Sequence, residues 1–231
     1  MASGAVDFPV VCLGGSAGAL QAYLEILRSV PAEVGLAFII VSHRGAEHSE
    51  ILPELLSRST KMPVIEAEEG MALRRDAVFL CPPDKELSFT GSTFHVHPKA
   101  TSLGWPRSIT LLLKSLAAAV GNRVIAVILS GMGADGSAAL MAVKASGGRI
   151  LVQSGAPYES MPNNAIEAGL VDRILTPSQI AADLVNCCKL IDRQTVQGEA
   201  WRRCFRHEMP RAARGSFQSV EVRVNIKTME S

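Results

Sequence analysis

The sequence of 231 residues lacks the long apolar runs and the strong charge imbalance that mark membrane-inserted and nucleic-acid-binding proteins. No stretch approaches the roughly 20 apolar residues that a membrane-spanning helix needs. The N-terminus has no charged segment followed by a long apolar core, so we expect no signal peptide. Lys and Arg number 23 against 22 Asp and Glu, and this net charge of +1 argues against a general polyanion-binding surface. We therefore expect a cytoplasmic protein with neither direct membrane insertion nor a nucleic-acid partner.

Cysteine is sparse and irregularly placed. Its positions form neither an even framework nor a C-x-x-C pair, so we expect no disulfide framework. The cysteines are Cys12, Cys81, Cys187, Cys188 and Cys204. Cys12 and Cys81 sit in or beside apolar runs, where free cysteine behaves as a small hydrophobic residue. A redox role for the adjacent Cys187 and Cys188 is the less favoured alternative, and the whole pattern fits a reducing cytoplasm.

Apolar residues are abundant, at 48% of the chain against 19% charged residues, and they form short runs that alternate with amphipathic stretches. Continuous apolar runs are typical of buried parallel strands. We expect strands at residues 10–13, 38–41, 64–65, 77–80, 87–89, 93–96, 124–129 and 149–153. Helical spacing of apolar residues predicts helices at residues 17–30, 49–59, 108–120, 137–146, 163–168 and 177–191. Ser108 is expected to cap its helix, and Gly121 to end it.

The strand–helix–strand order predicts an α/β fold. We expect a doubly wound, mainly parallel sheet with helices on both faces and a small β-hairpin insertion. Residues 1–8 are expected to form an N-terminal extension, residues 9–191 a single domain, and residues 192–231 a basic tail. A flexible or loosely docked tail is favoured over a basic contact to an acidic partner.

The first predicted strand ends in Gly14-Gly15-Ser16-Ala17-Gly18, which fits the G-x-S-x-G pattern at a strand-to-helix turn. Such a turn exposes a serine hydroxyl, and the helix N-terminus that follows favours a developing anion. A phosphate-gripping turn of a nucleotide-binding fold uses the same physics and is the alternative. It is disfavoured because Ser16 stands where a dinucleotide site needs its second glycine, and because no Walker lysine is present.

Two further strand ends supply the partners that an activated serine needs. His43 follows the second strand and can act as a general base, since its unperturbed pKa is near 6.5. Asp135 follows the apolar strand at 124–129 and can orient the histidine, although an N-cap role would also suit it. Carboxyl ends of parallel strands meet at one edge of a sheet, so we expect Ser16, His43 and Asp135 to converge. Their order along the chain excludes the α/β-hydrolase, chymotrypsin and subtilisin arrangements.

A metal site is the weaker interpretation of a second histidine motif. His95 and His97 form H-x-H on one face of a predicted strand, a spacing that can hold a metal ion. No third ligand lies nearby in the sequence, so a pair of hairpin residues is favoured over a zinc site.

Together these motifs resemble the catalytic domain of the CheB family, the protein-glutamate methylesterases of bacterial chemotaxis, over about residues 9–191. The matching stretches are VCLGGSAG at 11–18, VSH at 41–43, EAEEG at 66–70, ILSGMGADG at 128–136, ASGGRILVQ at 145–153 and SMPNNAIEAG at 160–169. The resemblance implies hydrolysis of glutamate methyl esters on the cytoplasmic domain of chemoreceptors, with release of methanol and no cofactor. Family members can also deamidate glutamines.

Residue roles carry over motif by motif. Ser16 resembles the family nucleophile, His43 its base and Asp135 its orienting acid. Met132 resembles a methionine near the oxyanion site that acts through its backbone. The remaining residues of the expected oxyanion and active-site loops are Ala17 and Gly133.

Three departures leave an alternative open. Family response regulators carry a receiver domain, whereas only about eight residues precede the first strand here, so a stand-alone module is expected. Ala17 follows the nucleophile where many members have threonine, and Thr110 stands where many have aspartate. A weak or inactive module that binds the receptor or a methyltransferase is therefore the alternative, and a separate receiver protein is a further candidate partner.

Overall fold

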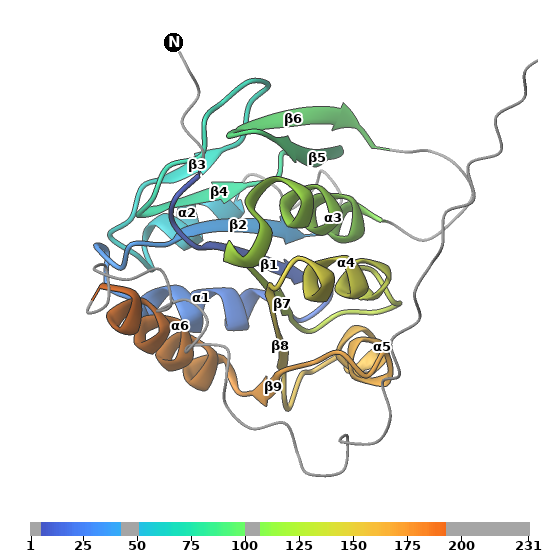
Figure 1. The fold of residues 1–231 in the computed structure, drawn as a ribbon. Helices are drawn as coiled ribbons and strands as arrows, with labels where there is room; N and C mark the ends of the chain where they lie inside the picture. The colour runs from blue at the N-terminus through green and yellow to red at the C-terminus, as the bar shows by residue number, and fades with distance from the viewer. Residues whose placement is uncertain (1–5, 43–50, 100–106, 193–231) are drawn as a thin grey trace, which may run out of the picture.

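The structure is a computed structural model that describes residues 6–42, 51–99 and 107–192, without the side chains of the last four (Figure 1). Its centre is a seven-stranded sheet in the order β3-β4-β2-β1-β7-β8-β9, and every pair of neighbouring strands is parallel. The strands are β1 (Val10–Gly15), β2 (Ala37–Ser42), β3 (Val64–Glu66), β4 (Ala77–Leu80), β7 (Val124–Ile128), β8 (Arg149–Gln153) and β9 (Arg173–Leu175). The predicted tail beyond Asp192 lies outside the described residues.

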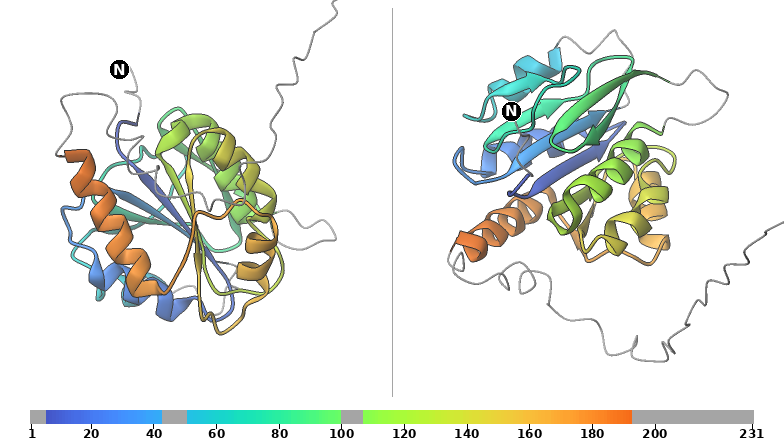
Figure 2. Two further views of the ribbon diagram at one scale, coloured as in Figure 1. Left: turned by 60° about the horizontal axis from the view of Figure 1, so that its bottom comes forward. Right: turned by 45° about the horizontal axis from the view of Figure 1, so that its top comes forward.

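Helices cover both faces of this sheet, as Figures 1 and 2 show. They are α1 (Leu20–Ser29), α2 (Ile51–Ser57), α3 (Ser108–Val120), α4 (Leu140–Ala145), α5 (Ser160–Glu167) and α6 (Pro177–Asp192). Residues of β1 alternate between the two cores: Val10 and Cys12 pack with α3, α4 and α5, and Val11 and Leu13 pack with α1, α2 and α6. The period of two along each strand therefore fills both layers, and the predicted doubly wound α/β fold is confirmed.

The predicted hairpin is also present, as an antiparallel pair of β5 (Lys85–Thr90) and β6 (Thr93–Pro98). It turns at Gly91, whose φ of 63° lies in the left-handed region. The hairpin packs against α3, where the Phe89 amide donates to Ser115 Oγ at 2.9 Å. Phe94 of the hairpin packs against Phe79 of the main sheet in a tilted arrangement, with ring centroids 5.1 Å apart.

The winding of the sheet changes direction between β1 and β7. After β1 the chain passes through α1 on one face, whereas after β7 it passes through α4 on the other face. The two strands therefore mark the switch point of the sheet. The carboxyl edge at such a switch point is where open α/β sheets bind ligands.

Some local predictions needed correction. The strand β9 was missed because it has three residues, of which Arg173 and Ile174 are exposed, so it carries no apolar run. The predicted helix 137–146 begins as a 3₁₀ turn, Ser137–Ala139. Ser108 does not cap α3: it lies inside the first turn, and its hydroxyl donates to Glu86 at 3.1 Å.

Across the described ranges, the helices are too short or too polar to span a bilayer.

Candidate active site

The turn after β1 is built around Ser16. Its amide donates to the carbonyl of Ser130 at 2.9 Å, and its carbonyl accepts from the amide of Ala19 at 3.2 Å. Gly15 must be glycine, because a Cβ there would lie 2.5 Å from Cβ of Ala19 and 2.6 Å from the hydroxyl of Tyr23. Crowding beneath the turn thus fixes the backbone that carries Ser16, while Ser16 itself stays half-buried at the sheet edge.

Ser130, at the end of the next strand, joins three loops around that turn. Its side chain is fully buried. Its hydroxyl donates to the carbonyl of Ala17 at 2.7 Å and accepts from the amide of Tyr158 at 3.0 Å. Its own amide donates to Oε1 of Gln153 at 2.9 Å. No sequence pattern marks Ser130, Gln153 and Tyr158 as partners in one network, because the bonded residues lie 23 to 113 positions apart.

The loop that follows Ser130 packs closely against the proposed nucleophile. A Cβ on Gly131 would lie 3.0 Å from Cβ of Ser16 and 2.3 Å from Sδ of Met161, so only glycine fits. Two residues later, the amide of Gly133 donates to Oγ of Ser160 at 3.2 Å. The carbonyl of Gly133 accepts from Nδ2 of Asn164 at 3.1 Å. The N-terminal turn of α5 therefore holds the shape of this loop.

Asp135 is buried, and it is the cap of α3. Its Oδ2 accepts from the amide of Ile109 at 2.9 Å. Its Oδ1 accepts from the amide and the hydroxyl of Thr110, at 2.9 and 2.7 Å, and from the amide of Gly136 at 2.7 Å. The carboxylate thus satisfies donors that the first turn of a helix leaves unpaired. The N-cap role suggested by the sequence is real, but it serves α3, whose start lies about 25 residues earlier in the chain.

Ile109 links the Asp135 loop to the end of β1. A Cβ on Gly14 would lie 2.7 Å from the side chain of Ile109, whose amide donates to Asp135. Cys12 lies on β1, two residues before Gly14. Burial raises the pKa of its thiol well above the ordinary range, and the nearby charge of Asp135 adds to this effect. Cys12 therefore stays protonated beneath the site and supplies no nucleophile.

His43, the predicted base, lies outside the described residues. The preceding residue, Ser42, ends β2 and pairs in register with Gly15, the residue before Ser16. The strands that precede the proposed base and nucleophile are therefore neighbours that end at the same level. The convergence of His43 with Ser16 and Asp135 stays a prediction.

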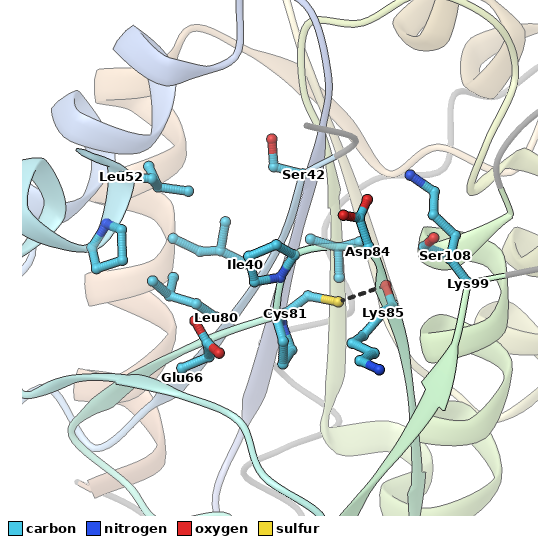
Figure 3. Close-up of a pocket in the computed structure, with 14 residues that line it drawn as sticks. Ile40, Ser42, Leu52, Glu66, Leu80, Cys81, Asp84, Lys85, Lys99 and Ser108 are labelled. Carbon is cyan, nitrogen blue, oxygen red and sulfur yellow. Dashed lines mark hydrogen bonds between the residues drawn. The ribbon is translucent and has the colours of Figure 1, made fainter. Parts of the chain in front are cut away.

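A pocket opens beside Ser42, at the carboxyl ends of β2 and β4 (Figure 3). Leu52 and Pro53 of α2 line one side, and Lys99 and Ser108 line the other. At its floor, Cys81 donates to the carbonyl of Lys85 at 3.4 Å, and burial raises the pKa of this thiol to about 12. The pocket thus combines an apolar floor with a charged rim, next to the strand end that precedes His43.

The histidines of the hairpin have protein partners. Nδ1 of His95 lies 2.8 Å from Oε1 of Glu69, and Nε2 of His97 lies 2.7 Å from Oγ of Ser88. The pKa of Glu69 is lowered by the hydrogen bond from the Val96 amide and by His95. Within the described ranges, no three His, Cys, Asp or Glu side chains gather as a metal site would require.

Comparisons with known proteins agree with this architecture. The family model described as CheB methylesterase matches residues 11–184. The chain is 34% identical over 176 residues to protein-glutamate methylesterase/protein-glutamine glutaminase 3 of Anaeromyxobacter dehalogenans, covering 74% of this chain and 52% of that protein. It is 29% identical over 186 residues to protein-glutamate methylesterase/protein-glutamine glutaminase 2 of Methanosarcina mazei, covering 76% of this chain and 51% of that protein. The chain therefore spans about half the length of these curated relatives.

A solved structure shows the same fold. The crystal structure of the Thermotoga maritima CheB methylesterase catalytic domain superposes with a TM-score of 0.73 at 26% identity, covering 78% of this chain and 99% of that one. The family match extends over most of the chain and includes both loops that surround Ser16. On this basis the chain belongs to the CheB methylesterase family.

Proposed function

We propose that this chain is a serine hydrolase that removes methyl groups from glutamate methyl esters of chemoreceptors, with Ser16, His43 and Asp135 as its catalytic triad. The observation that carries the proposal is the hydrogen bond from the Ser16 amide to the Ser130 carbonyl, which joins the nucleophile turn to the loop after β7. That junction lies at the switch point of the sheet, where ligands of doubly wound folds bind. The names of the curated relatives supply the substrate class.

The reaction proceeds through an acyl-enzyme. Ser16 Oγ attacks the ester carbonyl while His43 takes the serine proton, and the resulting imidazolium protonates the leaving methoxide as methanol. Water then attacks the acyl-enzyme while His43 takes one of its protons. The bond from the acyl carbon to Ser16 Oγ breaks as the imidazolium returns that proton to Ser16 Oγ, and the glutamic acid product ionises to the carboxylate. Asp135 orients the imidazole and stabilises its charged form. Its four hydrogen bonds from α3 and its own loop hold this carboxylate in one position.

Backbone amides stabilise the tetrahedral intermediate in this proposal. We assign the oxyanion site to the amides of Ala17 and Met132, which flank Ser16 in the two loops that Ser130 joins. Among the described residues, neither amide is used in a hydrogen bond, so both can serve an incoming oxyanion. The amide of Gly133 already donates to Ser160, and Gly133 therefore contributes the shape of the loop.

A glutamine side chain presents the same carbonyl carbon with ammonia as its leaving group. The printed names of the relatives pair methylesterase with glutaminase activity. We therefore extend the proposal to receptor glutamines, as substrates of the same triad.

Substitution of the nucleophile tests the proposal. We expect Ser16→Ala to lower methanol release from methylated receptor fragments by at least about a thousandfold, because the covalent step is lost. His43→Gln and Asp135→Asn change the other two members of the proposed triad. Adding either of them to Ser16→Ala should therefore lower methanol release little further. Ser29→Ala is the matched control, since the Ser29 hydroxyl only bonds the Glu25 carbonyl on the surface of α1.

Two readouts separate catalysis from binding. Labelling by an active-site serine probe should require both Ser16 and His43, and mass spectrometry should place the label on Ser16. Full methanol release by folded Ser16→Ala protein would overturn the assignment. Receptor binding without methanol release or labelling in the parent protein would favour the inactive binding module instead.

A further inference from the structure

Large apolar side chains are exposed at five positions of the described chain: Ile51, Met132, Met141, Tyr158 and Ile174. Two of them adjoin the nucleophile turn, where Met132 is 56% exposed and Tyr158 is 48% exposed. Met132 follows Gly131, where a Cβ would lie 3.0 Å from Cβ of Ser16, and Tyr158 lies in the loop between β8 and α5. Exposed apolar side chains beside a reactive group mark a surface that meets a partner.

The backbone of Tyr158 is locked to both loops that surround Ser16. Its amide donates to Ser130 Oγ at 3.0 Å, and its carbonyl accepts from the amide of Gly131 at 3.0 Å. Ser130 Oγ in turn donates to the carbonyl of Ala17. The position of Tyr158 is therefore set by the same hydrogen bonds that set the proposed oxyanion site.

The ring of Tyr158 lies against Gly18, at the other side of the nucleophile turn. A Cβ on Gly18 would be 2.9 Å from Cδ2 of Tyr158 and 3.1 Å from Cβ of Pro157. Gly18 has a φ of 75°, so this turn both requires glycine and leaves room for the ring. One edge of the ring thus lies beside the turn, and about half of the side chain is exposed.

We propose that Tyr158, together with the side chain of Met132, forms an apolar rim that binds the polypeptide segment presenting the glutamyl ester. This proposal rests on the function proposed above. The occupant is an apolar surface of the protein substrate beside the reacting glutamate, because the rim offers a ring and a thioether and no charge. A rigid aromatic side chain supplies such contact area at a small cost in side-chain entropy.

If the rim binds the polypeptide, removal of the ring should affect a receptor fragment more than a small ester that undergoes the same chemistry. We expect Tyr158→Ala to raise KM for a methylated receptor fragment about tenfold, with kcat changed less than about threefold. For the γ-methyl ester of N-acetylglutamate amide, which lacks the polypeptide, kcat/KM should fall less than about threefold. Tyr158→Phe keeps the ring and should stay within about twofold of the parent protein on both substrates. Ile174→Thr changes a similarly exposed side chain on the edge strand β9 and should match the parent.

Either of two results would overturn the rim. An equal fall in kcat on both substrates would show that the ring only supports the nucleophile turn. An unchanged KM for the receptor fragment would show that the ring does not contact the polypeptide. If Tyr158→Ala does not fold, Tyr158→Gln covers Gly18 with methylenes but removes the ring, and the same split is expected.

A binding measurement separates this inference from the proposed activity. In the Ser16→Ala background, fluorescence anisotropy of a labelled receptor fragment should show a Kd about tenfold weaker when Tyr158→Ala is added. That result supports the rim even if the parent protein releases no methanol. Equal Kd values with and without the ring would overturn the rim even if the esterase activity is real.

Discussion

At the scale of single residues, the site depends on polar groups whose partners are distant in the chain. Asp135 takes four hydrogen bonds, three of them from residues 109 and 110. Thr110 stands between the carboxylate and the loop, since its hydroxyl donates to Asp135 Oδ1 at 2.7 Å and accepts from the Gly136 amide at 2.9 Å. One hydroxyl therefore holds Asp135, the proposed orienting acid, and its loop together.

Removing that hydroxyl should cost stability. Thr110→Val keeps the shape of the side chain but takes one donor from a buried carboxylate, so we expect the free energy of unfolding to fall by about 2 kcal/mol. Thr110→Ser restores the donor and should recover more than half of the loss. Urea unfolding followed by circular dichroism measures both variants. A Thr110→Val protein as stable as its parent would show that Thr110 does not hold Asp135.

The residues of the proposed triad could be selected from the sequence because each follows a strongly apolar strand. Ser16 directly follows β1 and Asp135 lies in the loop after β7, and these two strands are neighbours in the sheet. The network around Ser130 could not be predicted in the same way. It joins residues up to 113 positions apart through side-chain contacts, and no periodicity reports such contacts.

At the scale of elements, α6 is fastened to the sheet by a buried charge cluster as well as by apolar packing. Asp183 of α6 lies 2.6 Å from Nη1 of Arg149 on β8, and both side chains are less than 10% exposed. Arg173 on β9 approaches the same carboxylate at 2.5 Å, but it is 53% exposed. The short strand β9, which has little apolar signal of its own, thus gains a partner from a later helix.

The buried pair and the exposed arginine of this cluster should contribute unequally to the free energy of unfolding. Asp183→Asn leaves Arg149 buried without a carboxylate, and breaking a buried pair in this way costs about 3 to 5 kcal/mol of unfolding free energy. Arg173→Gln removes only the exposed partner and should cost less than about 1 kcal/mol. Thermal unfolding of the two variants beside the parent protein tests the difference. Equal losses would mean that burial of Arg149 does not decide the strength of the cluster.

Elements were predicted most accurately where the pattern was long or fully apolar. The strands at 77–80 and 149–153 have the predicted bounds, because every residue in both is buried. The sequence suggests Ser108 as the cap of α3 because capping residues usually lie beside the helix that they cap. The actual cap is Asp135, which comes from another strand end and is visible only in three dimensions.

At the scale of the whole molecule, the buried residues of both hydrophobic cores lie between Val6 and Cys188. One core lies between the sheet and α3, α4 and α5, and the other between the sheet and α1, α2 and α6. The family match at 11–184 spans nearly the same range. Because each face of the sheet already has its helical layer, the described part satisfies the burial that this fold requires.

Because the residues of both cores precede Asp192, we expect the residues after Asp192 to be dispensable for folding. A chain ending at Asp192 should unfold in one cooperative transition within about 3 °C of the full chain, since it retains both cores. Its rate on the small glutamyl ester should stay within about twofold, because Ser16, His43 and Asp135 all remain. Calorimetry and methanol release measure the two quantities side by side with the full-length protein. A broad transition or a drop of more than about 10 °C would assign part of the fold to residues 193–231, and the domain boundary would then have to move toward the C-terminus.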